Sequence, residues 1–187
     1  MRHSIQQFFM VSAALVFFLV FISSPGQAQR EQFQAQAFGE GQQMGQTFGV
    51  TITINELSTP EDQKVLIDAF ASHGMNGLTN AISKMSSKGR IRMTGTLGYD
   101  VNYIRIFQTP TGRKIRLVTD RPITFGEAWG DRRSEDYSLS AIELDLGANG
   151  KGTGTLLPAC QFKINKQNEL EIEALRNPWR LSDVFKW

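Results

Sequence analysis

Residues 120–137 (DRPITFGEAWGDRRSEDY) bring together more side chains capable of chemistry than any other stretch of the chain. Two carboxylates held at a suitable spacing could act as general acid and general base, and an aromatic ring could stack on a sugar. The candidate catalytic residues are Asp120, Glu127 and Asp136, and the candidate ligand-binding residues here are Arg121, Trp129 and Tyr137. The alternative, which we favour, is a solvated connection whose acids and arginines pair with each other, each exposed pair contributing at most about 1 kcal/mol. In that interpretation Asp120 braces a turn beside Arg121 and Pro122.

Other kinds of catalytic or metal site find little support in the sequence. Beyond residue 28, histidine occurs once, as His73, and the single cysteine is Cys160. One His and one Cys cannot furnish a typical zinc site, and no Gly-x-Ser-x-Gly motif marks a serine nucleophile. The position of His73 near an expected helix end favours a capping role, and the strand-like surroundings of Cys160 favour a buried structural thiol. We therefore predict no metal and no cofactor.

A second group of candidate binding residues comes from the uneven distribution of charge. Residues 88–121 are rich in Lys and Arg, whereas residues 122–175 carry an excess of acids. Counting alternate residues along the expected strands points Ile91, Met93, Ile104, Ile106, Ile115 and Leu117 inward. The outward-facing candidates for ligand binding are Arg92, Tyr103, Arg105, Phe107 and Arg116. Such a face could hold an anionic polysaccharide, a lipid headgroup or a nucleic acid, but we favour cross-strand pairing with the acidic strands.

The first 28 residues have the features of a secretory signal peptide. Arg2 and His3 precede an uncharged apolar run at 8–22, and small residues at 26–28 suit a signal peptidase. Fifteen apolar residues fit a cleaved signal better than the roughly 20 needed to span a bilayer, although a retained anchor is the alternative. We expect export to the periplasm or the extracellular space. Residues 29–46, rich in Gln and Gly, are interpreted as a disordered leader.

A single globular domain is expected over residues 47–187. The pattern predicts a strand at 47–57, a helix at 60–73 after a hydroxyl cap, and a second short helix at 78–85, which together would form a helical hairpin on a sheet. Further strands are expected at 90–97, 101–109, 112–119, 138–146, 153–164, 169–175 and 180–185. The fold class is therefore α+β and mostly antiparallel β: one strand, a helical hairpin, then a six- to eight-strand meander forming a small barrel or a strongly bent sheet.

Three resemblances bear on this interpretation. The first strand, the helix pair and the following meander resemble the start of the helix-grip fold of lipid carriers, whose long C-terminal helix is missing here. The chain is also similar to an uncharacterised family of predicted secreted bacterial proteins with no known activity, over about residues 48–175. The residues that carry this second resemblance are Val118 to Ile123, Phe125, Glu127, Asp136 and Tyr137. Lastly, the alternating Trp179, Leu181, Phe185 and Trp187 resemble the terminal strand of an outer-membrane barrel, an alternation that Asp183 interrupts.

These observations favour an exported, non-enzymatic binding or interaction module. The alternatives are a carboxylate-dependent hydrolase that uses the 120–137 connection and a small outer-membrane β-barrel. The partner is left open among an anionic polysaccharide, a lipid headgroup and a small apolar ligand. No specific nucleic acid is expected, because the formal net charge is only +2 at pH 7.

Overall fold

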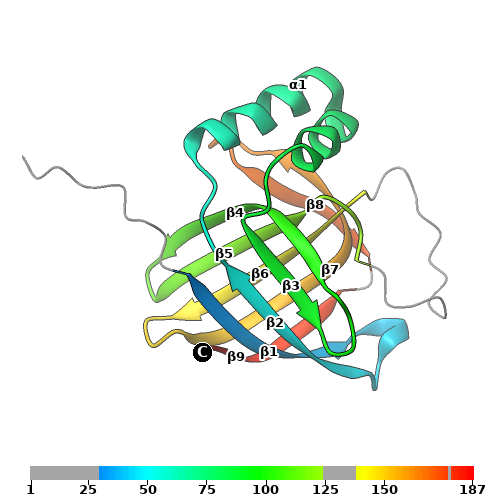
Figure 1. The fold of residues 1–187 in the computed structure, drawn as a ribbon, viewed down its shortest axis with the longest axis vertical. Coiled ribbons are helices and arrows are strands. Elements are labelled where there is room, and N and C mark those ends of the chain that lie inside the picture. Colours follow the sequence, from blue (N-terminus) through cyan, green and yellow to red (C-terminus); the bar gives the residue numbers. More distant parts are fainter. Residues whose placement is uncertain (1–29, 124–137, 177) are drawn as a thin grey trace, which may run out of the picture.

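Eight antiparallel strands close into a barrel, and a bent helix lies against its outer wall (Figure 1). The computed structural model describes residues 30–123, 138–176 and 178–187. The barrel strands are β1 (Glu31–Gly39), β2 (Thr47–Ile54), β3 (Gly89–Met93), β4 (Tyr99–Thr109), β5 (Gly112–Thr119), β6 (Leu139–Gly147), β7 (Lys151–Ile164) and β9 (Trp179–Lys186). Their order around the ring is β6-β5-β4-β3-β2-β1-β9-β7, and the pairing of β7 with β6 closes it. The prediction of mostly antiparallel β structure is confirmed, with a closed barrel rather than an open bent sheet.

Strand β8 (Leu170–Arg176) lies outside this ring. It pairs with residues Ala159–Ile164 of β7, which follow the part of β7 that pairs with β9. The barrel therefore has a two-stranded extension at one end, built by the C-terminal half of β7 together with β8.

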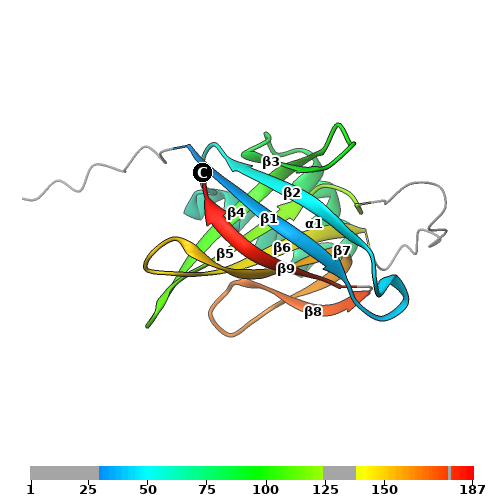
Figure 2. The ribbon, with the colours of Figure 1, turned by 90° about the horizontal axis from the view of Figure 1, so that it is seen from below.

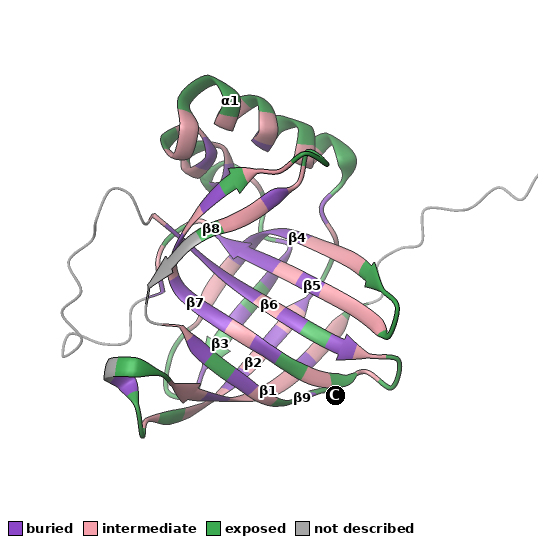
Figure 3. Cartoon of the chain, turned by 180° about the vertical axis from the view of Figure 1, so that it is seen from behind, coloured by how far each residue is buried: buried purple, intermediate pink, exposed green. Residues whose placement is uncertain are grey.

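Apolar side chains line the barrel interior. Buried and more exposed residues alternate along the strands (Figure 3). All eight barrel strands contribute buried residues, among them Phe33, Ile52, Ile91, Ile104, Leu117, Leu144, Leu156 and Trp179. The inward set predicted for β3, β4 and β5 is confirmed: its members are buried in this cluster, except Ile106, which is partly buried and packs against it. The period of two along each strand is therefore what separates the core from the outer wall.

The prediction of a disordered leader over residues 29–46 is wrong for most of that segment. Glu31–Gly39 forms β1, and Gly41–Gln43 forms the short 3-10 helix η1 before β2. Phe33, Ala35 and Ala37 are buried in the barrel core, and β1 pairs with β2 on one side and β9 on the other. Two strands therefore precede the helix instead of the predicted one, and the folded domain begins well before Thr47. The predicted signal peptide lies outside the described residues.

Helix α1 (Pro60–Ser83) begins as the sequence predicts and bends where the first of the two predicted helices is expected to end. The side chain of Thr59 accepts a hydrogen bond from the backbone N–H of Asp62, and the Asp62 carboxylate accepts one from the N–H of Thr59, which is a complete capping box. At His73 and Gly74 the backbone leaves the helical conformation, and Gly74 has a positive φ of 58°. The two predicted helices are therefore joined at this bend as segments of one element. No helix in the described part of the chain is long and apolar enough to cross a membrane.

A second core lies between α1, the outer wall of the barrel and β8. Leu66, Leu78 and Ile82 of α1 are fully buried there, whereas Phe70 and Met85 are only partly buried. The barrel and extension contribute Tyr103, Val118, Leu139, Ala141, Leu157, Cys160, Phe162 and Leu170. Cys160 is a buried free thiol, as expected, and its burial raises its pKa. The helix covers the outside of the barrel, so it is not gripped inside a bent sheet.

Gly77 allows the two segments of α1 to approach each other. A Cβ atom built at Gly77 would lie 2.2 Å from the main-chain carbonyl oxygen of Ala69, which a real side chain cannot tolerate. Gly77→Ala should therefore lower the free energy of unfolding by about 1–3 kcal/mol, although Ala is normally the better helix former. Asn76→Ala, at an exposed neighbouring position, is the matched control and should have little effect or stabilise slightly. Urea denaturation would measure both, and a stabilised Gly77→Ala variant would contradict the packing argument.

Candidate functional site

The 120–137 connection is described only at its start. Glu127, Trp129, Asp136 and Tyr137 lie outside the described residues, so the predicted pairing of carboxylates stays a prediction. Asp120 is half-buried just after β5, and its Oδ1 atom is buried with no hydrogen-bond partner among the residues that the structure describes. The guanidinium of the exposed Arg121 lies 5.4 Å from the ring centre of Tyr99.

Two buried hydroxyl groups hold the described start of this connection. Thr119 Oγ1 donates to the carbonyl oxygen of Arg121 at 2.6 Å. Ser140 Oγ accepts a hydrogen bond from the N–H of Ile123 and lies 2.5 Å from the carbonyl oxygen of Pro158, to which it can donate. Asp120 Oδ1 takes no part in these contacts, and the role predicted for Asp120 stays a prediction. Thr119 and Ser140 are both fully buried.

The cationic outer face predicted on β4 and β5 is neutralised by neighbouring acids. Arg105 pairs with Glu169 at 2.8 Å, and Arg116 pairs with Glu143 at 2.6 Å. The Arg116 guanidinium also lies 5.1 Å from the ring centre of Phe107. The cross-strand pairing that we favoured from the sequence accounts for these charges, so they do not form a free anion-binding face.

Tyr103 faces outward from the barrel, as predicted, but α1 and β8 cover it. Its side chain is 1% exposed, and its hydroxyl has no hydrogen-bond partner among the described residues. Burial raises the pKa of this phenol. Tyr103 therefore belongs to the second core and is not accessible to an external ligand.

Arg92 is the candidate from this group that remains available. It is exposed on β3, and its side chain makes no hydrogen bond or ion pair with any residue in the described ranges. It borders a hollow of about 730 Å³ on the outer wall formed by β1, β2, β3 and β9. Gly49, which has no side chain, and the short Thr94 lie side by side in this hollow, where the main chain of Thr94 donates to that of Gly49. The hollow therefore forms where the outward side chains are small.

Arg92 stands at one end of a row of outward side chains that crosses five adjacent strands. The strand register places these residues opposite one another in the order Lys151 (β7), Phe185 (β9), Gln34 (β1), Thr51 (β2) and Arg92 (β3). We call this set the polar row. β9, β1 and β2 lie side by side along this wall (Figure 2). Since neighbouring strands are 4.7–4.9 Å apart, the row spans roughly 19 Å along the curved wall of the barrel.

Phe185 stands between two hollows along the polar row. Besides the hollow beside Arg92, one of about 530 Å³ lies on the β7 side and is bordered by Lys151 and Thr153. Phe185 and Asp183 line both hollows, and the Phe185 side chain is 37% exposed. Asp183 adopts a positive φ of 51° next to the point where the register between β1 and β9 shifts. This irregularity turns the Asp183 side chain, which accepts a hydrogen bond from Ser182 Oγ, into the groove formed by the two hollows.

The sequence alone did not identify most of the polar row. Gln34 lies within the segment that the sequence predicts to be a leader, and no sequence pattern marks Thr51, Lys151 or Phe185 as binding residues. A signal was present in the alternation of glutamines with Phe33, Ala35 and Ala37 over residues 32–37. That alternation identifies a strand with a polar outer face, but it does not reveal which strands lie beside it.

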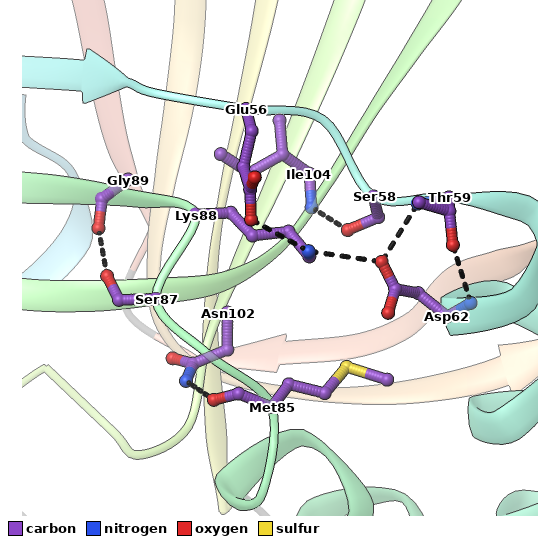
Figure 4. A network of polar contacts seen from close by, with 10 residues as sticks. All are labelled: Glu56, Ser58, Thr59, Asp62, Met85, Ser87, Lys88, Gly89, Asn102 and Ile104. Atoms are coloured by element: carbon purple, nitrogen blue, oxygen red, sulfur yellow. Dashed lines mark hydrogen bonds and ion pairs between the residues drawn. The ribbon is translucent and has the colours of Figure 1, made fainter.

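A buried lysine joins the start of α1 to the barrel (Figure 4). The Lys88 ammonium lies 3.1 Å from Asp62 Oδ2 and 3.2 Å from Glu56 Oε1, and its side chain is 7% exposed. Nearby, Asn102 Nδ2 donates to the carbonyl oxygen of Met85 at 2.9 Å. Burial would lower the pKa of Lys88, but the hydrogen bonds and charges of both carboxylates outweigh it and raise the pKa. Lys88 therefore stays protonated and acts as an anchor rather than as a base or nucleophile.

Across the described ranges, His, Cys, Asp and Glu side chains form no group of three that could hold a metal ion. Comparisons with protein-family models, with curated proteins and with solved structures found no significant match to this chain. The candidate site therefore rests on its own geometry, that of the outward-facing side chains of the polar row.

Proposed function

We propose that this chain is an exported, non-enzymatic binding module that holds an extended polysaccharide along the polar row. The observation that carries the proposal is the alignment of five outward side chains across five strands, with an exposed aromatic ring between two hollows. The predicted signal peptide supplies the export.

The chemistry of the row matches that of a sugar chain. A sugar ring presents an apolar face that can stack on an aromatic side chain and a rim of hydroxyls that need hydrogen-bond partners. Phe185 offers the ring, while Gln34, Gln36 and Thr51 offer amides and hydroxyls on the same wall. Two open hollows that share Phe185, on a row that follows the curved wall for roughly 19 Å, suit a linear polymer better than a small compact molecule.

The lining of the groove favours binding over hydrolysis. Glycoside hydrolysis usually requires two carboxyl groups separated by about 5–9.5 Å. Asp183 is the one acid among the described residues that line the two hollows. The outer-membrane alternative is also less well supported, because an apolar interior and polar residues on the outer wall reverse the arrangement of transmembrane barrels.

Phe185→Ala should weaken polysaccharide binding about threefold to tenfold, since the aromatic contact would be lost. Phe107→Ala is the matched control, because Phe107 lies on the outer wall at β4, outside both hollows. Affinity electrophoresis of the purified protein through gels containing soluble polysaccharides would find a ligand, and calorimetry would compare the variants. If Phe185→Ala bound as tightly as the parent protein, or if Phe107→Ala lost as much, the polar row would not be the site.

A further inference from the structure

We infer that the polysaccharide is acidic and that two cationic subsites, Arg92 at one end of the polar row and Lys151 at the other, bind its negative groups. This inference rests on the proposed function and names the class of polymer. The shared chemistry is an anionic oxygen group repeated along a sugar chain, supplied either by a uronate carboxylate or by a sulfate ester.

The first observation is the contrast between Arg92 and its neighbour Arg90 on the same strand. Arg90 pairs with Asp100 at 2.8 Å and also donates to the carbonyl oxygen of Leu97. Arg92 lies opposite Thr51 in the register, which offers no charge, and no described residue neutralises its guanidinium. A planar guanidinium next to a hollow can bind a carboxylate or a sulfate through two parallel hydrogen bonds.

The second observation is the same contrast at the other end of the row. Lys186, close to Lys151, pairs with Glu31 at 2.9 Å, and Glu31 also binds Arg113. Burial would raise the pKa of Glu31, but its hydrogen bonds with Lys186 and Arg113 outweigh it and lower the pKa. The Lys151 ammonium has no partner within the described parts of the chain. Both ends of the row therefore keep an available positive charge, whereas several of the surrounding cations are paired.

Asp183 places a negative charge between the two cationic ends, and a bound acidic chain must tolerate that charge. Its carboxylate already accepts a hydrogen bond from Ser182. With Phe185, it lines both hollows and faces the middle of a bound chain, where sugar hydroxyls can donate to it. The arrangement therefore selects a polymer whose charges fall at both ends of the groove, with hydroxyls between them.

The distance between the subsites sets the length of the ligand. Four inter-strand gaps separate β7 from β3, which gives roughly 19 Å between the ends of the row when it is followed along the curved outer wall. A disaccharide is too short to reach both cations, whereas a longer linear chain can occupy both subsites together. Binding through two linked subsites gains affinity because the second contact is intramolecular.

The test uses the purified protein and four probes: oligogalacturonides of two and of eight sugars, a sulfated dextran and neutral dextran. The eight-sugar acid should bind more tightly than neutral dextran, and binding should weaken as salt is added.

Arg92→Ala and Lys151→Ala should each weaken binding of the eight-sugar acid about fivefold. Arg90→Ala and Lys163→Ala, on the same two strands but outside the hollows, are the matched controls and should change little. The side chains exchanged are exposed, so unchanged melting temperatures should accompany these losses.

The probes separate the sources of charge and the two proposals. Tighter binding of the oligogalacturonide identifies uronates, and tighter binding of sulfated dextran identifies sulfate esters; either supports the two cationic subsites. The inference is overturned if neutral dextran binds as tightly as the charged probes and Phe185→Ala alone weakens binding, a result that leaves the proposed function intact. It is also overturned if Arg92→Ala or Lys151→Ala has no effect on the eight-sugar acid. If none of the probes binds, neutral or charged, both proposals fail together.

Discussion

Phe33→Ala should lower the free energy of unfolding by about 3–5 kcal/mol. Phe33 is fully buried in the barrel core, and it lies on β1, the strand that joins β2 to β9. Removing its ring leaves a cavity in the interior and weakens the strand that completes this side of the barrel. Urea denaturation of the purified protein, followed by tryptophan fluorescence, would measure the loss.

Phe38→Ala is the control on the same strand. Phe38 is only partly buried, and its ring lies 5.8 Å from the Arg180 guanidinium, so its removal should cost well under the Phe33 value. Equal and small losses for the two variants would mean that β1 contributes little to the folded domain, as a disordered leader would. A large loss at Phe33 alone would establish β1 as part of the barrel.

Local patterns were sufficient to predict most of the strands. Residues 112–119 were predicted as a strand with Ile115 and Leu117 inward, and β5 has those bounds and those buried residues. The start of α1 was equally clear, because the Thr59 cap and the first-turn acids act within a few residues of each other. In both cases the determining interactions are local, so the sequence contains them in one short window.

Closure of the barrel could not be predicted in the same way. β1 pairs with β9, with Phe38 opposite Arg180, so the contact joins positions at the two ends of the domain. The small inward residues Ala35 and Ala37 made the segment look weakly hydrophobic, and its glutamines suggested disorder. What decides the structure is burial against distant strands, which outweighs the weak local preference for a strand.

The candidate site was missed for a related reason. The arginines that cluster in the sequence over residues 88–121 separate once the register is known. Arg105 and Arg116 lie beside Glu169 and Glu143, whereas Arg92 lies opposite Thr51. The sequence therefore identifies the cationic side chains, but only the pairing of strands determines which of them remain without an acidic partner.

Removing both carboxylates around Lys88 should be as damaging as removing a large core side chain. The double variant Glu56→Gln with Asp62→Asn leaves a buried ammonium without a counter-charge, and we expect a loss of about 3–5 kcal/mol. Asn at position 62 keeps an oxygen that can accept the hydrogen bond from Thr59, so the helix cap is retained. Adding Lys88→Met to the double variant removes the buried charge and should restore most of the stability.

The same cluster predicts how stability depends on pH. Burial would raise the pKa of Asp62, but the hydrogen bonds from Thr59 and Lys88 outweigh it and lower the pKa below its ordinary value of 3.8. Its contribution is therefore complete above about pH 4 and is lost as the pH falls through its pKa in the folded protein. Lys88 gives the opposite dependence on pH, because its pKa is raised. Its contribution to stability is complete below its ordinary pKa of 10.5 and is lost at higher pH. Urea denaturation between pH 2 and pH 7 would measure the free energy of unfolding of the parent protein and of the Asp62→Asn variant. The difference between the two free energies should shrink below about pH 4. A difference that stayed constant to pH 2 would show that the ion pair contributes nothing.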